Sequence, residues 1–250
     1  MVDNRLAEVE EWARPREAAG LTADLPAGLR FHRGEGIPLS LRGQVFKRNK
    51  TLRLVRELVR TSNSKLITVL DLGCGWGELL DRLMRSLPSD LATRCLPHGV
   101  EISRELARLS DKRLGLHGGR CVHASAQDGI QQFDHRYFDV IVMASYLEHE
   151  VNPLPVLQGC RERLKPEGAL FIKVPNYACL NRRLRGAKWC GFRWPDHVNY
   201  FTPHTLRAML DKAGLEIVSM TALDQSILSD NMYAIARLKG LWCKPAARLE

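Results

Sequence analysis

The sequence lacks the features that mark membrane-spanning and disulfide-stabilised proteins. Its longest nearly apolar run, Leu66–Leu72, is far shorter than the roughly 20 residues that a helix needs to cross a bilayer. Its seven cysteines are an odd number, with no C-x-x-C pair and no Cys/His spacing typical of a zinc site. The segment 1–19 is acidic and contains Pro15, unlike a signal peptide. We therefore expect free thiols and a cytoplasmic protein without a transmembrane segment.

Internal repeats and low-complexity tracts are also absent. The chain has 250 residues, of which 45% are hydrophobic, so it can bury a core without metal or disulfide cross-links. We divide it into an N-terminal arm at 1–41 and one domain at 42–248. The final Leu249-Glu250 is interpreted as a tag junction.

The positive charge is concentrated in one stretch. The formal net charge is +9, and residues 161–193 carry nine Lys/Arg against two Asp/Glu. A local basic patch is typical of a protein with an anionic partner. A solvated surface without such a role explains the same pattern, and both interpretations stay open.

Strand-like and helix-like segments alternate from residue 66 onward. The predicted strands are Leu66–Leu72, Leu96–Glu101, Arg120–His123, Phe138–Ala144, Leu170–Val174, Leu215–Met220 and Met232–Leu238. The predicted helices are Arg42–Arg60, Glu78–Leu87, Arg104–Leu114, Leu154–Leu164 (with Asn152 as N-cap), and one that begins at Thr202-Pro203 and ends at Gly214.

This alternation predicts βαβ units and a parallel sheet. The connection Thr221–Asn231 is too short for a crossover helix, so the last strand should be antiparallel. The expected fold is a doubly wound, Rossmann-like α/β domain with a seven-stranded sheet, mostly parallel with an antiparallel last strand. A basic and aromatic insert at about 176–202 interrupts the alternation.

A glycine-rich loop, Gly73-Cys74-Gly75-Trp76-Gly77, follows the first strand. Its G-x-G-x-G spacing has Glu78 where the dinucleotide fingerprint needs a glycine. Asp71, just before the loop, would repel a pyrophosphate but suits a ligand with an ammonium group. Glu101, at the end of the second strand, is placed to accept hydrogen bonds from ribose hydroxyls. Together they indicate a nucleoside joined to an amino acid, namely S-adenosylmethionine (SAM).

The segment Val69–Gly77 resembles motif I of the class I SAM-dependent methyltransferases. Leu147-Glu148-His149 resembles their sequence after the fourth strand, and Leu164–Leu170 is similar to their hairpin before the fifth. Trp194–Pro203 resembles the subgroup that modifies sugars, glycolipids and quinone-type small molecules. The resemblance implies a methyltransferase with SAM as its cofactor.

The resemblance also assigns cofactor positions. They are Asp71, Gly73, Cys74, Gly75, Glu101, Ile102, Ser125, Ala126, Gln127 and Ala144. Ala144 would offer its carbonyl to the ligand's amino group, and residues 125–127 would flank the adenine. The family usually has an acidic residue where Ser125 stands.

Methyl transfer from a sulfonium needs alignment, and a base helps only when the nucleophile is a hydroxyl. His149 and His197 are the candidate bases, although a histidine after the fourth strand can also serve to cap a helix or orient a loop. Glu148 is interpreted as a structural partner. Quinone and small-RNA methyltransferases that bind a metal carry E-x-x-E-H. Because Ser145 replaces the first Glu of that motif, we expect no metal, although Glu148 and both histidines could still hold one.

The acceptor is expected to be an oxygen. Methyltransferases of exocyclic amines usually carry N/D-P-P-Y/F after the fourth strand, where this chain has Ala144-Ser145-Tyr146-Leu147. Acceptor residues are sought in the insert, where Arg could clamp a phosphate and Trp could stack on a ring. The candidates are Arg182, Arg185, Trp189, Trp194 and Tyr200. The alternative is an insert that packs over the sheet through its aromatic residues.

The sequence thus predicts a SAM-dependent O-methyltransferase for a small or conjugated acceptor, with a sugar or glycolipid expected and an anionic group one candidate. An RNA 2′-O-methyltransferase is a weaker alternative, because the surface outside the insert is nearly neutral and no nucleic-acid-binding module is appended. A non-catalytic partner subunit is the other alternative, and it is disfavoured by the intact acids and glycines of the loop. The oligomeric state stays open.

Overall fold

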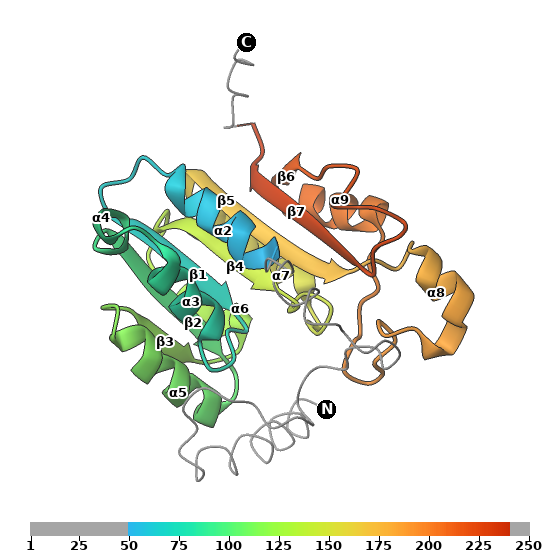
Figure 1. Ribbon diagram of the computed structural model, residues 1–250, viewed down its shortest axis with the longest axis horizontal. Helices are drawn as coiled ribbons and strands as arrows, with labels where there is room; N and C mark the ends of the chain where they lie inside the picture. The colour runs from blue at the N-terminus through green and yellow to red at the C-terminus, as the bar shows by residue number, and fades with distance from the viewer. Residues whose placement is uncertain (1–49, 241–250) are drawn as a thin grey trace, which may run out of the picture.

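The computed structural model describes residues 50–240, so the expected arm at 1–41 and the tag junction at 249–250 lie outside the described residues. One seven-stranded sheet has the order β3-β2-β1-β4-β5-β7-β6 (Figure 1). Strands β1 to β5 pair in parallel, whereas β7 is antiparallel to both β5 and β6. The expected doubly wound α/β fold with an antiparallel last strand is confirmed.

The strands are β1 (Ile67–Leu72), β2 (Cys95–Glu101), β3 (Arg120–His123), β4 (Phe138–Ala144), β5 (Leu164–Pro175), β6 (Leu215–Ser219) and β7 (Asn231–Leu238). The helices are α2 (Lys50–Arg60), α3 (Glu78–Ser86), α4 (Ser89–Ala92), α5 (Arg104–Gly115), α6 (Ala126–Gln131), α7 (Pro153–Arg163), α8 (Leu180–Arg185) and α9 (Pro203–Lys212), with a 3₁₀ turn η3 (Gly186–Lys188).

The short helices α4, α6 and α8 are missing from the prediction, because segments of four to six residues are too short to display a helical hydrophobic period. Asn152 does stand at the N-cap of α7, but its side chain makes no capping hydrogen bond. Thr202 caps α9 as expected, in a reciprocal capping box with Thr205.

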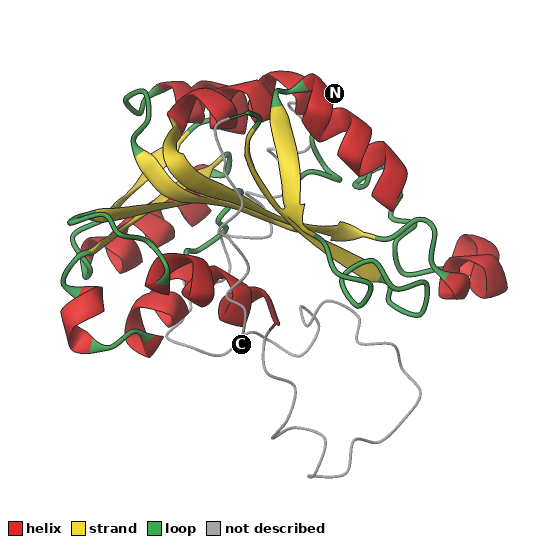
Figure 2. Cartoon of the chain, turned by 90° about the horizontal axis from the view of Figure 1, so that it is seen from above, coloured by secondary structure: helices red, strands yellow, loops and turns green. Residues whose placement is uncertain are grey.

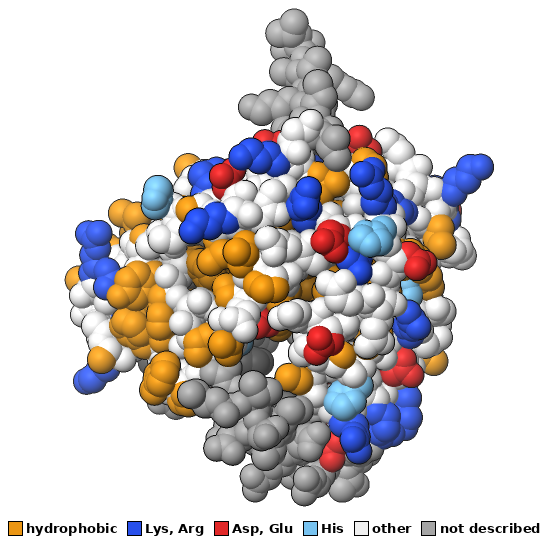
Figure 3. Space-filling view, turned by 180° about the vertical axis from the view of Figure 1, so that it is seen from behind, with side chains coloured by type: hydrophobic (Ala, Val, Ile, Leu, Met, Phe, Trp, Pro, Cys, Tyr) orange, Lys and Arg blue, Asp and Glu red, His pale blue; other side chains and the backbone are white. Residues whose placement is uncertain are grey.

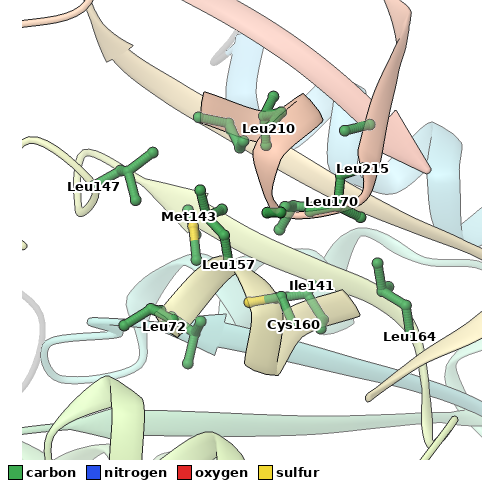
Figure 4. Close-up of a cluster of buried hydrophobic side chains, with 14 of the residues drawn as sticks. Leu72, Ile141, Met143, Leu147, Leu157, Cys160, Leu164, Leu170, Leu210 and Leu215 are labelled. Carbon is green, nitrogen blue, oxygen red and sulfur yellow. The ribbon is translucent and has the colours of Figure 1, made fainter. Parts of the chain in front are cut away.

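Helices cover both faces of the sheet (Figure 2). Successive residues of the central strands point to opposite faces, so Leu70 and Leu72 join one core cluster while Ile67 and Val69 join the other. The first cluster packs under α6, α7 and α9, and Figure 4 shows its members Leu157 of α7 and Leu210 of α9. The second packs under α2, α3 and α5. This two-sided burial explains why the strands are almost uniformly apolar. No helix within residues 50–240 combines the length and apolarity that a bilayer crossing requires.

The strand order places a topological switch point between β1 and β4. From β1 the chain builds outward to β2 and β3, and then returns to add β4 and β5 on the other side. Ligands of open α/β sheets bind beyond the carboxyl ends of the strands at such a point. The loops after β1, β2, β4 and β5 are therefore where a site is expected.

At the opposite, amino end of β4, a buried carboxylate joins three segments. Asp139 is 7% exposed. Its Oδ1 accepts hydrogen bonds from the Ser62 and Ser64 hydroxyls, and its Oδ2 accepts from Thr68 N at 2.8 Å and Lys165 Nζ at 2.6 Å. Burial alone would raise the pKa of Asp139, but these hydrogen bonds hold it below its ordinary value. The loop after α2 is thereby tied to β1 and β5.

We expect Asp139→Asn to lower the free energy of unfolding by about 2 kcal/mol at neutral pH, because it leaves Lys165 without its charged partner. The effect is smaller than for a fully buried ion pair, because solvent screens part of the interaction between the two charges. The pKa of Asp139 is lowered in the folded state, so the wild-type advantage exists at neutral pH and disappears as the pH falls through that value. Urea unfolding at neutral and acidic pH measures both. Asp211→Asn, at an exposed pair with Lys239, is the control, and an equal loss in the control would contradict this role of Asp139.

Candidate functional site

The glycine-rich loop leaves β1 at the switch point and is pinned to β2. Gly73 N and Cys74 N both donate to Val100 O, at 2.9 and 3.2 Å. Gly73 has φ +70°, and a Cβ there would lie 2.5 Å from Tyr146 Cδ2, so the loop passes close beneath the segment after β4. Gly75 has φ +55°, but a Cβ there would meet nothing within 4 Å. There is therefore no room for a side chain at Gly73, whereas the space over Gly75 is open to a ligand.

Two buried carboxyl groups flank this loop, and we name them the acid pair. Asp71 is 4% exposed and Glu101 is 7% exposed. Glu101 accepts hydrogen bonds from Gly75 N at 2.8 Å and Ser103 N at 3.0 Å. Burial and the proximity of Glu101 raise the pKa of Asp71 to about 8. Burial also raises the pKa of Glu101, against the lowering effect of its backbone donors. A cation between the two acids would relieve their repulsion.

The other predicted cofactor residues divide into two groups. Ile102 is 38% exposed beside Glu101, and Ala144 ends β4 beside the loop. In contrast, Cys74 Sγ lies 3.3 Å from Ser110 Oγ and 3.6 Å from Cys121 Sγ, so its side chain is used in packing. A direct contact of that side chain with the cofactor is therefore not supported. Only the Cys74 backbone lies in the loop.

The segment after β3 begins the short helix α6. Ser125 Oγ accepts from Asp128 N at 3.2 Å and donates to Asp128 Oδ2 at 2.7 Å, so this hydroxyl caps the helix. Ala126 is buried and Gln127 is exposed. Of these three residues, Gln127 has the side chain that is most accessible to an adenine.

A second set of polar groups lies after β4, and we name Glu148, His149 and His197 the histidine cluster. One ligand atom from each lies within 4.8 Å of the others. The two imidazole rings are 4.6 Å apart, edge to face. Glu148 O accepts from Val198 N and Asn199 N at 2.9 and 3.0 Å, which ties the insert to the segment after β4. The structure thus brings together both candidate bases, which are 48 residues apart in sequence.

The two histidines have opposite electrostatic surroundings. His149 Nδ1 lies 2.9 Å from Asp196 O. Burial opposes its protonation, but Asp196 and Glu148 outweigh burial and raise the pKa of His149. Burial and the neighbouring His149 lower the pKa of His197. His197 Nδ1 lies 2.9 Å from Gly191 O, which can only accept, so Nε2 is the basic nitrogen of the neutral ring.

Glu148 supplies an unsatisfied charge to this cluster. It is 1% exposed, and its Oε2 has no hydrogen-bond partner among the described residues. A carboxylate oxygen and two imidazole nitrogens could ligate a divalent cation. Lys173 also lies close enough to Glu148 for their charges to interact, which makes a protein ammonium group an alternative source of positive charge.

Lys173 is a candidate that the sequence analysis missed. It lies near the carboxyl end of β5, and its Nζ donates to Ser145 Oγ at 3.0 Å. Ser145 itself has φ +60°, a conformation that costs free energy for a residue with a Cβ. Burial lowers the pKa of Lys173, against the effect of Glu148. A lysine within the strand pattern Phe-Ile-Lys-Val looks like any strand position, so only the strand pairing reveals its place.

Three of the predicted acceptor residues, Arg182, Trp189 and Tyr200, gather around the Tyr177 ring. Trp189 is 1% exposed, and its Nε1 donates to Asp230 Oδ1 at 2.8 Å. Tyr200 packs near Tyr177 and Phe192, at ring distances of 5.6 and 5.3 Å. Stacking of an acceptor on Trp189 is therefore wrong, since this ring is the core of the insert. The insert does pack through its aromatic residues, as the alternative interpretation proposed.

The remaining predicted acceptor residues differ in exposure. The Arg182 guanidinium lies over the Tyr177 ring, 4.4 Å from its centroid. Arg185 is exposed on α8, and Trp194 is 77% exposed. A phosphate clamp formed by Arg182 and Arg185, three residues apart on α8, stays a prediction.

Known proteins of similar sequence indicate the family of this chain. Residues 42–220 match the family model described as a methyltransferase domain. A ubiquinone biosynthesis O-methyltransferase of Cereibacter sphaeroides is 28% identical over 162 residues, which are 61% of this chain and 61% of that protein. The protein of the same name from Azoarcus sp. is 27% identical over 188 residues, or 68% and 72% of the two chains. The match thus spans 61% of the length of the first relative.

Solved structures show the same fold. The CcbJ methyltransferase from Streptomyces caelestis has a TM-score of 0.56 and 18% identity, covering 75% of this chain and 89% of that chain. The trans-methyltransferase CalH in complex with S-adenosylhomocysteine (SAH) has a TM-score of 0.57 and 18% identity, covering 75% and 55%. At these identities the likeness establishes the fold alone.

We expect binding of SAH to strengthen as the pH rises toward 8 and Asp71→Asn to remove this dependence. With its pKa raised to about 8, Asp71 must lose a proton when the ligand's ammonium group binds at lower pH. One linked proton changes the dissociation constant by at most about tenfold per pH unit. Calorimetric titration at several pH values measures this slope.

Asp81→Asn, at another buried acid on α3, is the matched control and should keep the wild-type slope. A wild-type affinity that does not change between neutral pH and pH 8 would contradict the role of Asp71 in binding the ligand's cationic group.

Proposed function

Since the chain belongs to the methyltransferase-domain family, we propose that it transfers a methyl group from SAM to a hydroxyl oxygen of a small acceptor. The observation that carries this proposal is the joint placement of the acid pair and the histidine cluster around the switch point. The acid pair suits the cationic cofactor. An imidazole whose pKa is lowered, held beside one whose pKa is raised, suits a hydroxyl nucleophile.

The acceptor class that we favour is a phenolic hydroxyl. The sequence led us to expect a sugar or glycolipid, but Trp189, one of the two tryptophans proposed to stack on its ring, is buried. Relatives with 27–28% identity are named ubiquinone biosynthesis O-methyltransferases, a name that supports an aromatic hydroxyl. Lys173 and the protonated form of His149, which Asp196 and Glu148 favour, would stabilise the phenolate that forms as the proton leaves.

In the proposed reaction, the acceptor oxygen attacks the methyl carbon of SAM in line with the departing sulfur. The sulfur leaves as the neutral thioether of SAH, so no acid is needed at the leaving group. His197 Nε2 takes the hydroxyl proton, and Glu148 stabilises the imidazolium ion. The fold aligns the two reactants by placing the cofactor loop and the segment after β4 side by side.

We expect His197→Asn to lower turnover at saturating SAM by roughly 10². The Asn amide can still donate to Gly191 O, so this variant should fold and bind SAH as the wild type does. Because the pKa of His197 lies below the ordinary 6.5, wild-type turnover should fall on the acid side only as the pH drops through this lowered pKa. Steady-state rates with a catechol acceptor, measured across this pH range, test both points.

His135→Ala is the control, because this exposed histidine precedes β4 at the opposite end of the sheet. A chelator should leave the wild-type rate unchanged. Full activity of His197→Asn would remove the base from the mechanism. Loss of activity on chelation, restored by a divalent cation, would instead make the histidine cluster a metal site.

A further inference from the structure

An apolar surface outside the candidate site is formed by α8 and the loop before β7. We name Leu180, Leu184, Ile227 and Leu228 the α8 patch. Their exposed fractions are 39%, 76%, 60% and 78%. Leu180 and Leu184 are one turn apart on α8, and Leu180 N donates to Ile227 O at 2.7 Å, which joins the two segments. Single exposed leucines are ordinary, but an apolar patch that spans two segments marks a binding surface.

The α8 patch is bordered by positive charge. Residues 176–195 contain five Lys/Arg and no Asp/Glu. Three of these cations, Arg183, Arg185 and Lys188, are exposed on α8 and η3. Figure 3 shows hydrophobic side chains gathered on the side of the molecule where α8 projects, with Lys and Arg at its margin. The surface therefore combines exposed apolar side chains with cations.

The exposure of these leucines is built into the fold. Asp230 accepts hydrogen bonds from Asn181 Nδ2 at 3.0 Å and from Trp189 Nε1 at 2.8 Å. Asn176 Nδ2 donates to Ser226 O at 3.1 Å. These contacts hold α8 against the loop before β7 and turn Trp189 inward, so this ring is buried while the leucines face outward. If hydrophobic burial alone determined the packing of the insert, these leucines would be buried as well.

We propose that the α8 patch binds the surface of a bilayer that contains anionic lipids. The leucines and Ile227 would enter the boundary between head groups and acyl chains, and Arg183, Arg185 and Lys188 would contact the lipid phosphates. Charge complementarity selects this occupant over a second copy of the chain. In a two-fold dimer through this patch, the same three cations would face each other and repel.

Bilayer binding would also orient the molecule. The insert that carries α8 begins at Asn176, immediately after β5, so the docked surface belongs to the same edge of the sheet as Lys173 and the histidine cluster. Lipid binding by the α8 patch does not depend on the proposed methyl transfer, so each can be tested without the other.

Flotation of the full chain with vesicles tests the proposal. We expect binding to mixed phosphatidylcholine–phosphatidylglycerol vesicles that weakens with added salt, and little binding to phosphatidylcholine alone. The combined change Arg183→Gln, Arg185→Gln and Lys188→Gln should lower the partition coefficient on the order of 10²-fold. The combined change Leu184→Ser, Ile227→Ser and Leu228→Ser should lower it at least as much.

The matched control is Leu116→Ser with Lys112→Gln, which removes an equally exposed leucine (76%) and an exposed cation at the end of α5. This control should bind vesicles as the wild type does. The glutamine variant changes only exposed side chains, so thermal unfolding should match the wild type. Equal binding to both kinds of vesicle, equal loss in the control, or no binding by the wild type would overturn the proposal. A wild-type dimer that the serine variant converts to a monomer would overturn it in favour of a subunit interface.

Discussion

The burial of two carboxyl groups at the ends of neighbouring strands is the constraint around which this structure is organised. Asp71 and Glu101 lie almost without solvent, and burial raises the pKa of both. The glycine loop supports this arrangement, since Gly75 N donates to Glu101 while Gly75 leaves open space on its other side. Such a pair is best stabilised by a cation, and the proposed cofactor carries positive charge on its sulfur and its amino group.

The second half of the proposed site depends on contacts between distant segments. Glu148 O binds two backbone N–H groups of the insert, which brings His197 beside His149. Their surroundings then separate the two pKa values in opposite directions. The insert is therefore part of the proposed active centre at its histidine end. Its aromatic core, closed by the bond from Trp189 to Asp230, holds α8 in place.

Local patterns predicted the strands, the glycine loop and the acids beside it, because these depend on residues close together in sequence. The misassigned and missed residues depend on distant partners. Trp189 was interpreted as an acceptor contact because its partner Asp230 lies 41 residues downstream. The packing role of the Cys74 side chain was missed because Ser110 and Cys121, which contact it, lie 36 and 47 residues downstream. Lys173 was missed because β5 must pair with β4 before it meets Ser145.

The most direct test of the account is the identity of the methylated atom. The protein would be incubated with SAM carrying a carbon-13 methyl group and a catechol that also bears an amino group, and the product would be examined by NMR. The account predicts a methoxy carbon in the product, formed by the wild type and by His135→Ala but strongly reduced in His197→Asn. A labelled methyl group on nitrogen or on ring carbon, or a methoxy product formed equally by His197→Asn, would contradict it.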